Sequence, residues 1–103
     1  MDRLAMLTEI LIQNPTDAFA RYGLAMEYSN HGNIAKSLEE FGKLLSTHPD
    51  YAAGYFMAAQ TLMKEDRSEE ARTMLSNGIA AAKRTNNGHA QSEMQALLDE
   101  LSS

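Results

Sequence analysis

The sequence predicts an all-α fold of about six helices that pair as antiparallel hairpins. Apolar residues recur at intervals of three or four, the spacing of one helix face, in the series Ala18, Tyr22, Ala25, Tyr28 and Leu38, Phe41, Leu44, Leu45. No stretch sustains the alternation of apolar and polar residues that indicates a half-buried β-strand. Two prolines followed by turn-forming residues divide the chain into segments of helix length.

The prolines set the predicted starts of the second and fourth helices. Pro15 and Pro49 each end a helical segment, because proline cannot continue a helix. Thr16 and Asp50 follow them directly and are the expected N-caps, since a side-chain oxygen there can accept from the free amides of the first turn.

Glycine and asparagine mark the remaining helix ends. Gly32 is expected to supply the left-handed residue that ends the second helix, and Asn33 is expected to cap the third. Asp66 stands where a repeat of this pattern would place glycine, so it must adopt or avoid a left-handed conformation at some cost. Residues 86–88, Asn-Asn-Gly, end the fifth helix. The predicted helices span residues 2–13, 17–30, 34–47, 51–64, 68–84 and 89–101.

Size, charge and composition exclude several classes of function. The chain has 103 residues, enough for a single domain, and a formal net charge of -5, opposite in sign to the basic field that binds nucleic acids. It contains no cysteine, which excludes disulfides and Cys-ligated metals and suits a cytoplasmic protein. We expect no export signal, because the start of the sequence lacks a basic leader, and Thr8 and Glu9 interrupt its only apolar stretch. We expect no membrane span, because no apolar run approaches the length of about twenty residues that crosses a bilayer.

The two prolines lie 34 positions apart, and this interval also aligns Leu4 with Leu38 and Leu11 with Leu45. The 34-residue period and its residues resemble the tetratricopeptide repeat (TPR) family. The first unit matches the family at Leu24-Ala25, Tyr28, Phe41 and Pro49. It departs from the family at Arg21, where a large aromatic residue is expected, and at Ser37, where a small alanine is expected.

The second unit matches at Tyr55, Ala59, Ala71 and Leu75, and it has Lys83 in the place of the next proline, which predicts a longer helix. The resemblance covers roughly residues 4–84 and implies a right-handed α-solenoid formed by one domain of residues 1–103. Its parts are a capping half-repeat at 2–13, repeats at 17–48 and 51–84, and a capping helix at 89–101 with an apolar stripe of Met94, Leu97, Leu98 and Leu101.

No residue pattern predicts catalysis, a metal site or a cofactor, so we expect a non-enzymatic protein. The histidines stand alone beside turns, at His31, His48 and His89. The paired carboxylates cannot share a proton from adjacent helix positions and are expected on solvated faces, at Glu39-Glu40 and Glu69-Glu70. The glycines inside helical segments are expected at close helix crossings, at Gly23, Gly42, Gly54 and Gly78.

A second apolar stripe on the first helix of each unit is the candidate partner-binding site. Helix 17–30 carries Phe19, Tyr22 and Met26 apart from the face that meets its hairpin partner. The resemblance implies that this stripe lines a concave groove, to which the second repeat would add Phe56, Gln60 and Met63. Such a groove suits an apolar helix or peptide of another protein.

Two alternatives to an open groove remain at this point. The stripe residues can instead pack between neighbouring helices or under the C-terminal helix, leaving no site. The groove or the leucine-rich terminal helix can also mediate self-association into a homodimer. Binding of a chaperone's C-terminal carboxylate is not expected, because Tyr22 and Met26 stand where family members that bind it carry basic and amide residues.

Overall fold

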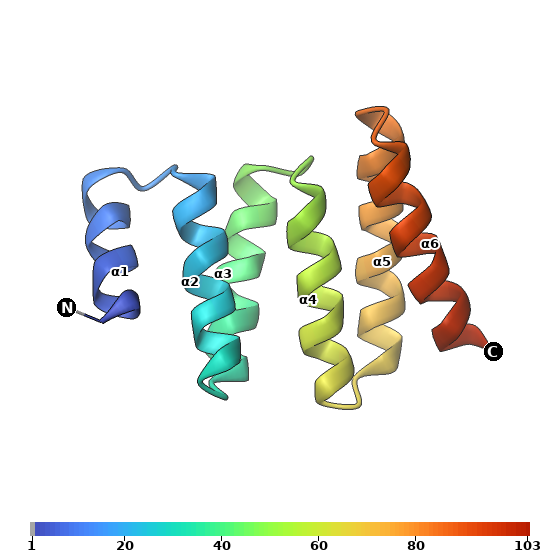
Figure 1. The fold of residues 1–103 in the computed structure, drawn as a ribbon, viewed down its shortest axis with the longest axis horizontal. Coiled ribbons are helices and arrows are strands. Elements are labelled where there is room, and N and C mark those ends of the chain that lie inside the picture. Colours follow the sequence, from blue (N-terminus) through green and yellow to red (C-terminus); the bar gives the residue numbers. More distant parts are fainter. Residues whose placement is uncertain (1) are drawn as a thin grey trace. The chain divides into compact units, whose positions relative to one another are not determined.

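The computed structural model describes residues 2–103, in which six α-helices and no strand occur (Figure 1). The helices are α1 (Arg3–Gln13), α2 (Ala18–Asn30), α3 (Ile34–Thr47), α4 (Ala52–Lys64), α5 (Ser68–Arg84) and α6 (Gly88–Ser102). The predicted all-α class is confirmed, and every predicted helix end lies within one residue of the observed one. None of the helices in residues 2–103 has the length and apolar character of a membrane-spanning helix.

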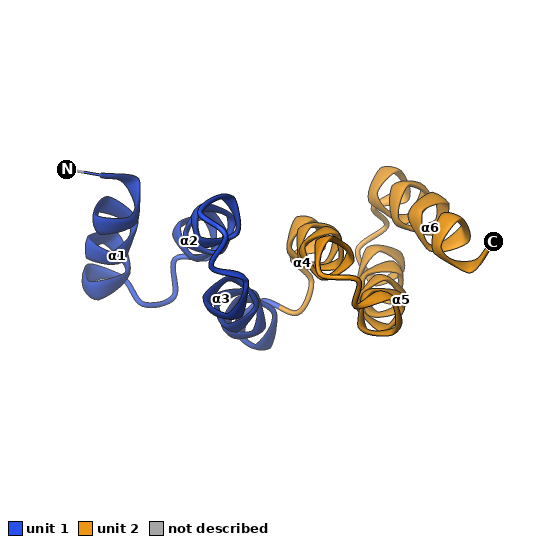
Figure 2. Cartoon of the chain, turned by 90° about the horizontal axis from the view of Figure 1, so that it is seen from below, with its two compact units in different colours: residues 1–48 blue, residues 49–103 orange. Residues whose placement is uncertain are grey.

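The chain forms two compact units, Met1–His48 with α1 to α3 and Pro49–Ser103 with α4 to α6 (Figure 2). In the first unit α2 packs against both α1 and α3, and in the second α5 packs against both α4 and α6. Helix α5 has 17 residues against 14 in α3, which confirms the longer helix predicted from Lys83 in the place of proline.

Both predicted N-caps after the prolines are wrong by one residue. Asp17, not Thr16, caps α2, and its carboxylate accepts a hydrogen bond from the Ala20 amide at 2.9 Å. Tyr51, not Asp50, precedes α4 and makes no side-chain capping bond. The cap must stand directly before the first helical residue to reach the amides of the first turn, and each helix begins one residue later than expected.

Three turns in the chain share one hydrogen-bond pattern and one left-handed residue each. Gly32, Asp66 and Asn86 have φ values of 79°, 58° and 54°. After each of them, the next amide donates to the carbonyl five residues earlier: Asn33 to Tyr28, Arg67 to Leu62, and Asn87 to Ala82. This pattern satisfies carbonyls at the helix C-terminus, so the turns after α2, α4 and α5 are built alike. Asn33 caps α3 as predicted, accepting from the Lys36 amide at 3.3 Å.

Replacing Asp66 with glycine is expected to raise the free energy of unfolding by about 0.5 to 1 kcal/mol. A left-handed conformation is strained for a residue with a Cβ, so glycine relieves strain in the folded state. Part of this gain in stability is lost, because glycine also raises the conformational entropy of the unfolded chain. Urea unfolding followed by circular dichroism measures the effect. The matched change Gly32→Asp should lower stability by a similar amount, and equal stability of all three proteins would contradict the account.

The core of the first unit joins α1 to α2 through Leu7, Leu11, Ala20 and Leu24, with Leu4 and Tyr28 packed against them. A Cβ on Gly23 would lie 3.2 Å from Leu7, so this glycine stands at a close crossing as predicted. In the second unit Gly78 fits against Tyr55 and Met94. Gly42 contradicts the prediction, because a Cβ there would meet nothing within 4 Å. Within the apolar stripe of α6, Met94 is buried and the three leucines are half-buried.

Candidate functional site

Helix α2 displays the most exposed large apolar side chain among the described residues. Phe19 lies in the first turn of α2 and is 74% exposed. Tyr22 and Met26 follow on the same helix face and are half-buried. The Tyr22 ring meets Phe41 of α3 edge to face, with ring centroids 6.4 Å apart. The stripe is therefore anchored in the hairpin at Tyr22 and open at Phe19.

The second predicted stripe lies on α4 in the other unit. Phe56, Gln60 and Met63 share one face of this helix, and all three are half-buried. Helix α6 packs against α4 as well as against α5. Each unit thus brings three of the six predicted residues onto one face of its first repeat helix.

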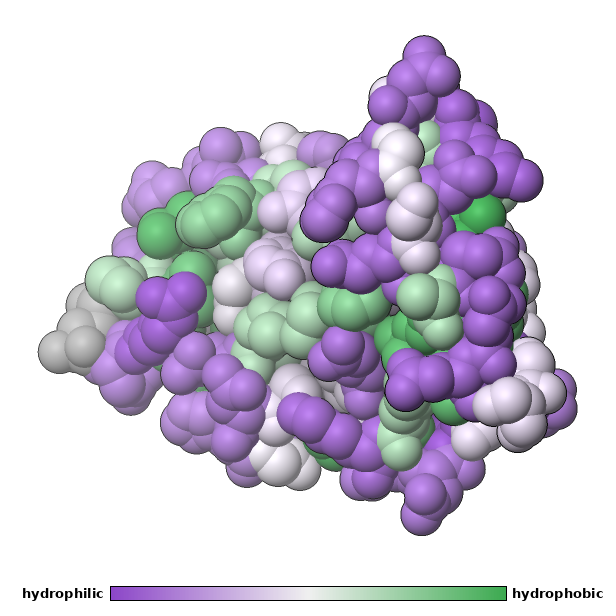
Figure 3. Space-filling model, turned by 45° about the vertical axis from the view of Figure 1, so that its right-hand side comes forward, coloured by the Kyte–Doolittle hydropathy of each residue, from purple (hydrophilic) through white to green (hydrophobic). Residues whose placement is uncertain are grey.

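The exposed apolar surface includes a part that sequence reasoning missed. Among residues 2–103 the exposed large apolar side chains all belong to the first unit: Met6, Ile10 and Ile12 of α1, and Phe19 of α2. Figure 3 shows apolar residues interrupting the hydrophilic surface on one face of the molecule. In the 34-residue register Ile10 corresponds to Leu44, which is fully buried, whereas Ile10 is 39% exposed.

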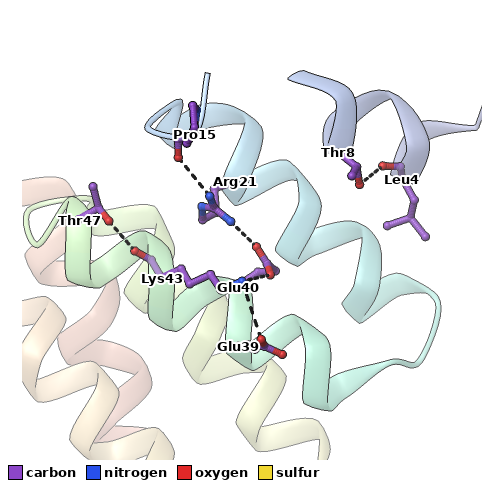
Figure 4. Close-up of polar contacts among 8 residues, drawn as sticks. All are labelled: Leu4, Thr8, Pro15, Arg21, Glu39, Glu40, Lys43 and Thr47. Atoms are coloured by element: carbon purple, nitrogen blue, oxygen red, sulfur yellow. Dashed lines mark hydrogen bonds and ion pairs between the residues drawn. The ribbon is translucent and has the colours of Figure 1, made fainter. Parts of the chain in front are cut away.

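The prediction that Glu40 lies on a solvated face is wrong. Glu40 is 8% exposed, and its carboxylate accepts a hydrogen bond from Arg21 Nη1 at 2.6 Å (Figure 4). Lys43 Nζ donates to the other carboxylate oxygen at 3.2 Å and lies 3.8 Å from Glu39. In the sequence, Arg21 is the residue that could have indicated this ion pair, because a cation in the place of a packed aromatic residue needs a buried acceptor.

Arg21 and Tyr55 occupy equivalent positions in the two repeats and make equivalent hydrogen bonds, although the two side chains differ chemically. Arg21 Nη2 donates to the Pro15 carbonyl at 3.1 Å, as Figure 4 shows, and the Tyr55 hydroxyl donates to the Pro49 carbonyl at 2.6 Å. Each side chain thus binds the loop that precedes its own helix. The other departure from the family pattern, Ser37, is fully buried, and its hydroxyl donates to the Ala25 carbonyl at 2.8 Å. The buried Ser37 hydroxyl therefore has the hydrogen-bond acceptor that it requires, whereas an alanine in this place would require none.

The other paired carboxylates are exposed at the start of α5, as predicted. Arg67 donates to both oxygens of Glu70, at 2.8 and 2.6 Å. This hydrogen bonding lowers the pKa of Glu70 below its ordinary value, with a smaller contribution from the charge of Arg67. Because the folded pKa is the lower one, the pair stabilises the fold at neutral pH, and that contribution is lost as the pH falls through the lowered pKa.

The histidines lie at helix ends. His31 and His48 are the C-caps of α2 and α3, and His89 is in the first turn of α6. The His48 ring Nε2 lies 3.0 Å from the Thr16 carbonyl oxygen. In the part of the chain that the structure describes, no three His, Asp or Glu side chains are grouped to hold a metal ion.

Comparisons with known proteins agree with this architecture, although no protein-family model matches the sequence. The chain is 36% identical over 62 residues to the uncharacterized protein MJ0572 of Methanocaldococcus jannaschii, a match that covers 60% of this chain and 72% of that protein. It is 31% identical to a tetratricopeptide repeat domain protein from Salinibacter ruber, whose solution NMR structure matches with a TM-score of 0.80 over 85% of this chain and 89% of that one.

A more distant structure shares the fold alone. The type III secretion translocator chaperone SycD of Yersinia enterocolitica matches with a TM-score of 0.84 at 12% sequence identity. The match covers 96% of this chain and 69% of that one.

Proposed function

Because this chain belongs to the tetratricopeptide repeat family, we propose that it is a non-enzymatic module that binds a helix or an extended peptide of a partner protein. The partner-binding residues in this proposal are Phe19, Tyr22 and Met26 on α2, and Phe56, Gln60 and Met63 on α4. No cofactor takes part, and the cysteine-free composition suits a cytoplasmic site of action.

The exposure of Phe19 is the observation that carries the proposal. An aromatic ring that is 74% exposed contributes little to the fold, and it offers a partner a large apolar surface at a small cost in side-chain entropy. The half-buried Tyr22 and Met26 beside it extend this surface along α2. The flexible, apolar side chain of Met26 can pack against partner surfaces of different shape. We therefore expect the contacts of the partner to be chiefly apolar.

The stripe on α4 differs from that on α2 by one polar residue. Gln60 stands between Phe56 and Met63 on the same face, and its amide can orient a partner by hydrogen bonding. The stripes contain no Lys or Arg, which argues against a carboxylate as the main group recognised.

Changing Phe19 to alanine is expected to weaken partner binding by about thirtyfold, which corresponds to about 2 kcal/mol for an aromatic residue at the centre of an interface. The partner is first captured with the wild-type chain, and the dissociation constant of each variant is then measured by calorimetry. The matched control is Ile12→Ala, which removes a side chain of similar exposure, 67%, from α1.

Equal affinity of the Phe19→Ala, control and wild-type chains would refute a binding role for this stripe. Phe56→Ala tests the stripe on α4 in the same assay. Sedimentation at several concentrations tests self-association, the alternative function, for which α6 offers no exposed large apolar side chain within the described residues.

A further inference from the structure

The outer face of α1 is apolar and has no helix beside it in the part of the chain that the structure describes. Leu7 and Leu11 of α1 are buried against α2. Met6 and Ile10, one helical turn apart on another face, are 44% and 39% exposed. Helix α1 therefore has apolar residues on two faces, and only one of them is covered.

The 34-residue register shows what normally covers this second face. Met6 and Ile10 correspond to Glu40 and Leu44 of α3, which are 8% and 0% exposed. Helix α3 packs against α2, the first helix of its own repeat, and Glu40 binds Arg21 of that helix. Among residues 2–103, no antiparallel first helix takes the equivalent place at α1.

The charges along this face favour a basic occupant. Glu9 is exposed and follows one edge of the Met6 and Ile10 stripe. Asp2, seven residues before it, is the exposed N-cap of α1, and its carboxylate accepts a hydrogen bond from the Ala5 amide at 2.8 Å. The one basic residue of α1, Arg3, is paired with Glu27 of α2 at 3.1 Å. Among the described residues, Glu9 accepts a long hydrogen bond from the Gln13 amide, at 3.5 Å, and forms no ion pair.

We propose that the outer face of α1, defined as Met6 and Ile10 with Glu9 along its edge, docks one amphipathic helix of a partner protein. The docked helix carries an apolar stripe at helical spacing, with Lys or Arg residues opposite the acidic edge. It lies antiparallel to α1, in the place that a repeat's first helix takes beside its second.

The same charges disfavour a second copy of this chain as the occupant. In an antiparallel two-fold pair of α1 helices, each edge meets its own equivalent, so Glu9 of one copy would face the acidic edge of the other. The formal net charge of -5 adds to this repulsion. A basic partner helix meets neither obstacle.

Two synthetic 18-residue peptides test the proposal. One has leucines at helical spacing flanked by lysines, and the other has glutamate in place of every lysine. With carbon-13 labels on the Met and Ile methyl groups, the lysine peptide is expected to shift the Met6 and Ile10 signals to saturation. The glutamate peptide is expected to bind at least tenfold more weakly.

Variants on the two sides of α1 give matched controls. Ile10→Lys is expected to weaken binding of the lysine peptide at least tenfold. Ile12→Lys makes the same change at a 67% exposed position on another face of the helix and should leave the dissociation constant within twofold. Glu9→Lys should reverse the preference between the two peptides. Thermal melting by circular dichroism confirms that each variant is folded.

Three results would overturn the proposal. The Met6 and Ile10 signals could stay unmoved by both peptides, or Glu9→Lys could leave their ratio of affinities unchanged. A mass that rises with concentration, and that Ile10→Lys abolishes, would assign the face to a second copy instead. This face is separate from the stripes on α2 and α4, so a failure here leaves the function proposed above standing.

Discussion

Replacing Gly78 with alanine is expected to lower the free energy of unfolding by about 3 kcal/mol, the upper end of what overpacking a well-packed core costs. A Cβ at this position would lie 2.6 Å from Tyr55 Cβ and 2.5 Å from Met94 Sδ. The thioether can move, but Tyr55 Cβ is fixed to the α4 backbone, so α4 and α5 must separate. This cost exceeds the gain of about 1 kcal/mol in helix propensity from glycine to alanine. Urea unfolding followed by circular dichroism measures the difference.

Gly42→Ala is the matched control for this effect. Gly42 lies inside α3 and is exposed, and nothing would meet its added Cβ within 4 Å. This variant should be more stable than wild type by about 0.5 to 1 kcal/mol, because only helix propensity changes. If both variants changed stability in the same direction and by the same amount, the close crossing at Gly78 would not be the cause.

Replacing Glu40 with alanine is expected to cost about 2 to 3 kcal/mol of stability, somewhat below the range for fully buried ion pairs that lose one partner. The Arg21 and Glu40 side chains are 19% and 10% exposed, so the guanidinium would lose its main acceptor in a largely dry site. The Pro15 carbonyl would remain as its hydrogen-bond partner. The same unfolding assay measures the loss.

Two further variants separate the buried pair from a general effect of charge. Glu39→Ala removes an equal charge from the neighbouring, 62% exposed side chain and should change stability by less than about 0.5 kcal/mol. The double variant Arg21→Tyr with Glu40→Met copies the residues of the second repeat, Tyr55 and Met74, and should recover most of the loss. A Glu40→Ala chain as stable as the Glu39→Ala chain would show that the pair contributes nothing.

The helices were predictable from sequence because their ends are chemically marked. Pro15 and Pro49 stop helices by geometry, and Gly32 supplies the left-handed residue that its turn requires. The exact caps were harder, since Thr16 and Asp17 are adjacent and both suit an N-cap. Only the position of the first helical residue decides between them, and that position depends on packing.

Packing also decides what sequence could not show at the site. Gly42 and Gly78 look equivalent in a helical pattern, yet one is open and the other lies against Tyr55. Glu39 and Glu40 are neighbours of the same type, and only Glu40 points toward α2, where Arg21 meets it. The exposed positions Met6 and Ile10 match buried positions in the register, because periodicity records which faces are apolar and not which faces are covered.

The bonds from Arg21 and Tyr55 to proline carbonyls each close a ring of the chain between residues six apart. Each repeat therefore carries a hydrogen bond to its own entry loop, donated by a guanidinium in the first repeat and by a phenol in the second. A repeat segment that begins at Pro49 and is copied in tandem would carry this hydrogen bond with it. In an extended array built in this way, the start of every added helix would be fixed by a contact within its own repeat and would not depend on the preceding repeat.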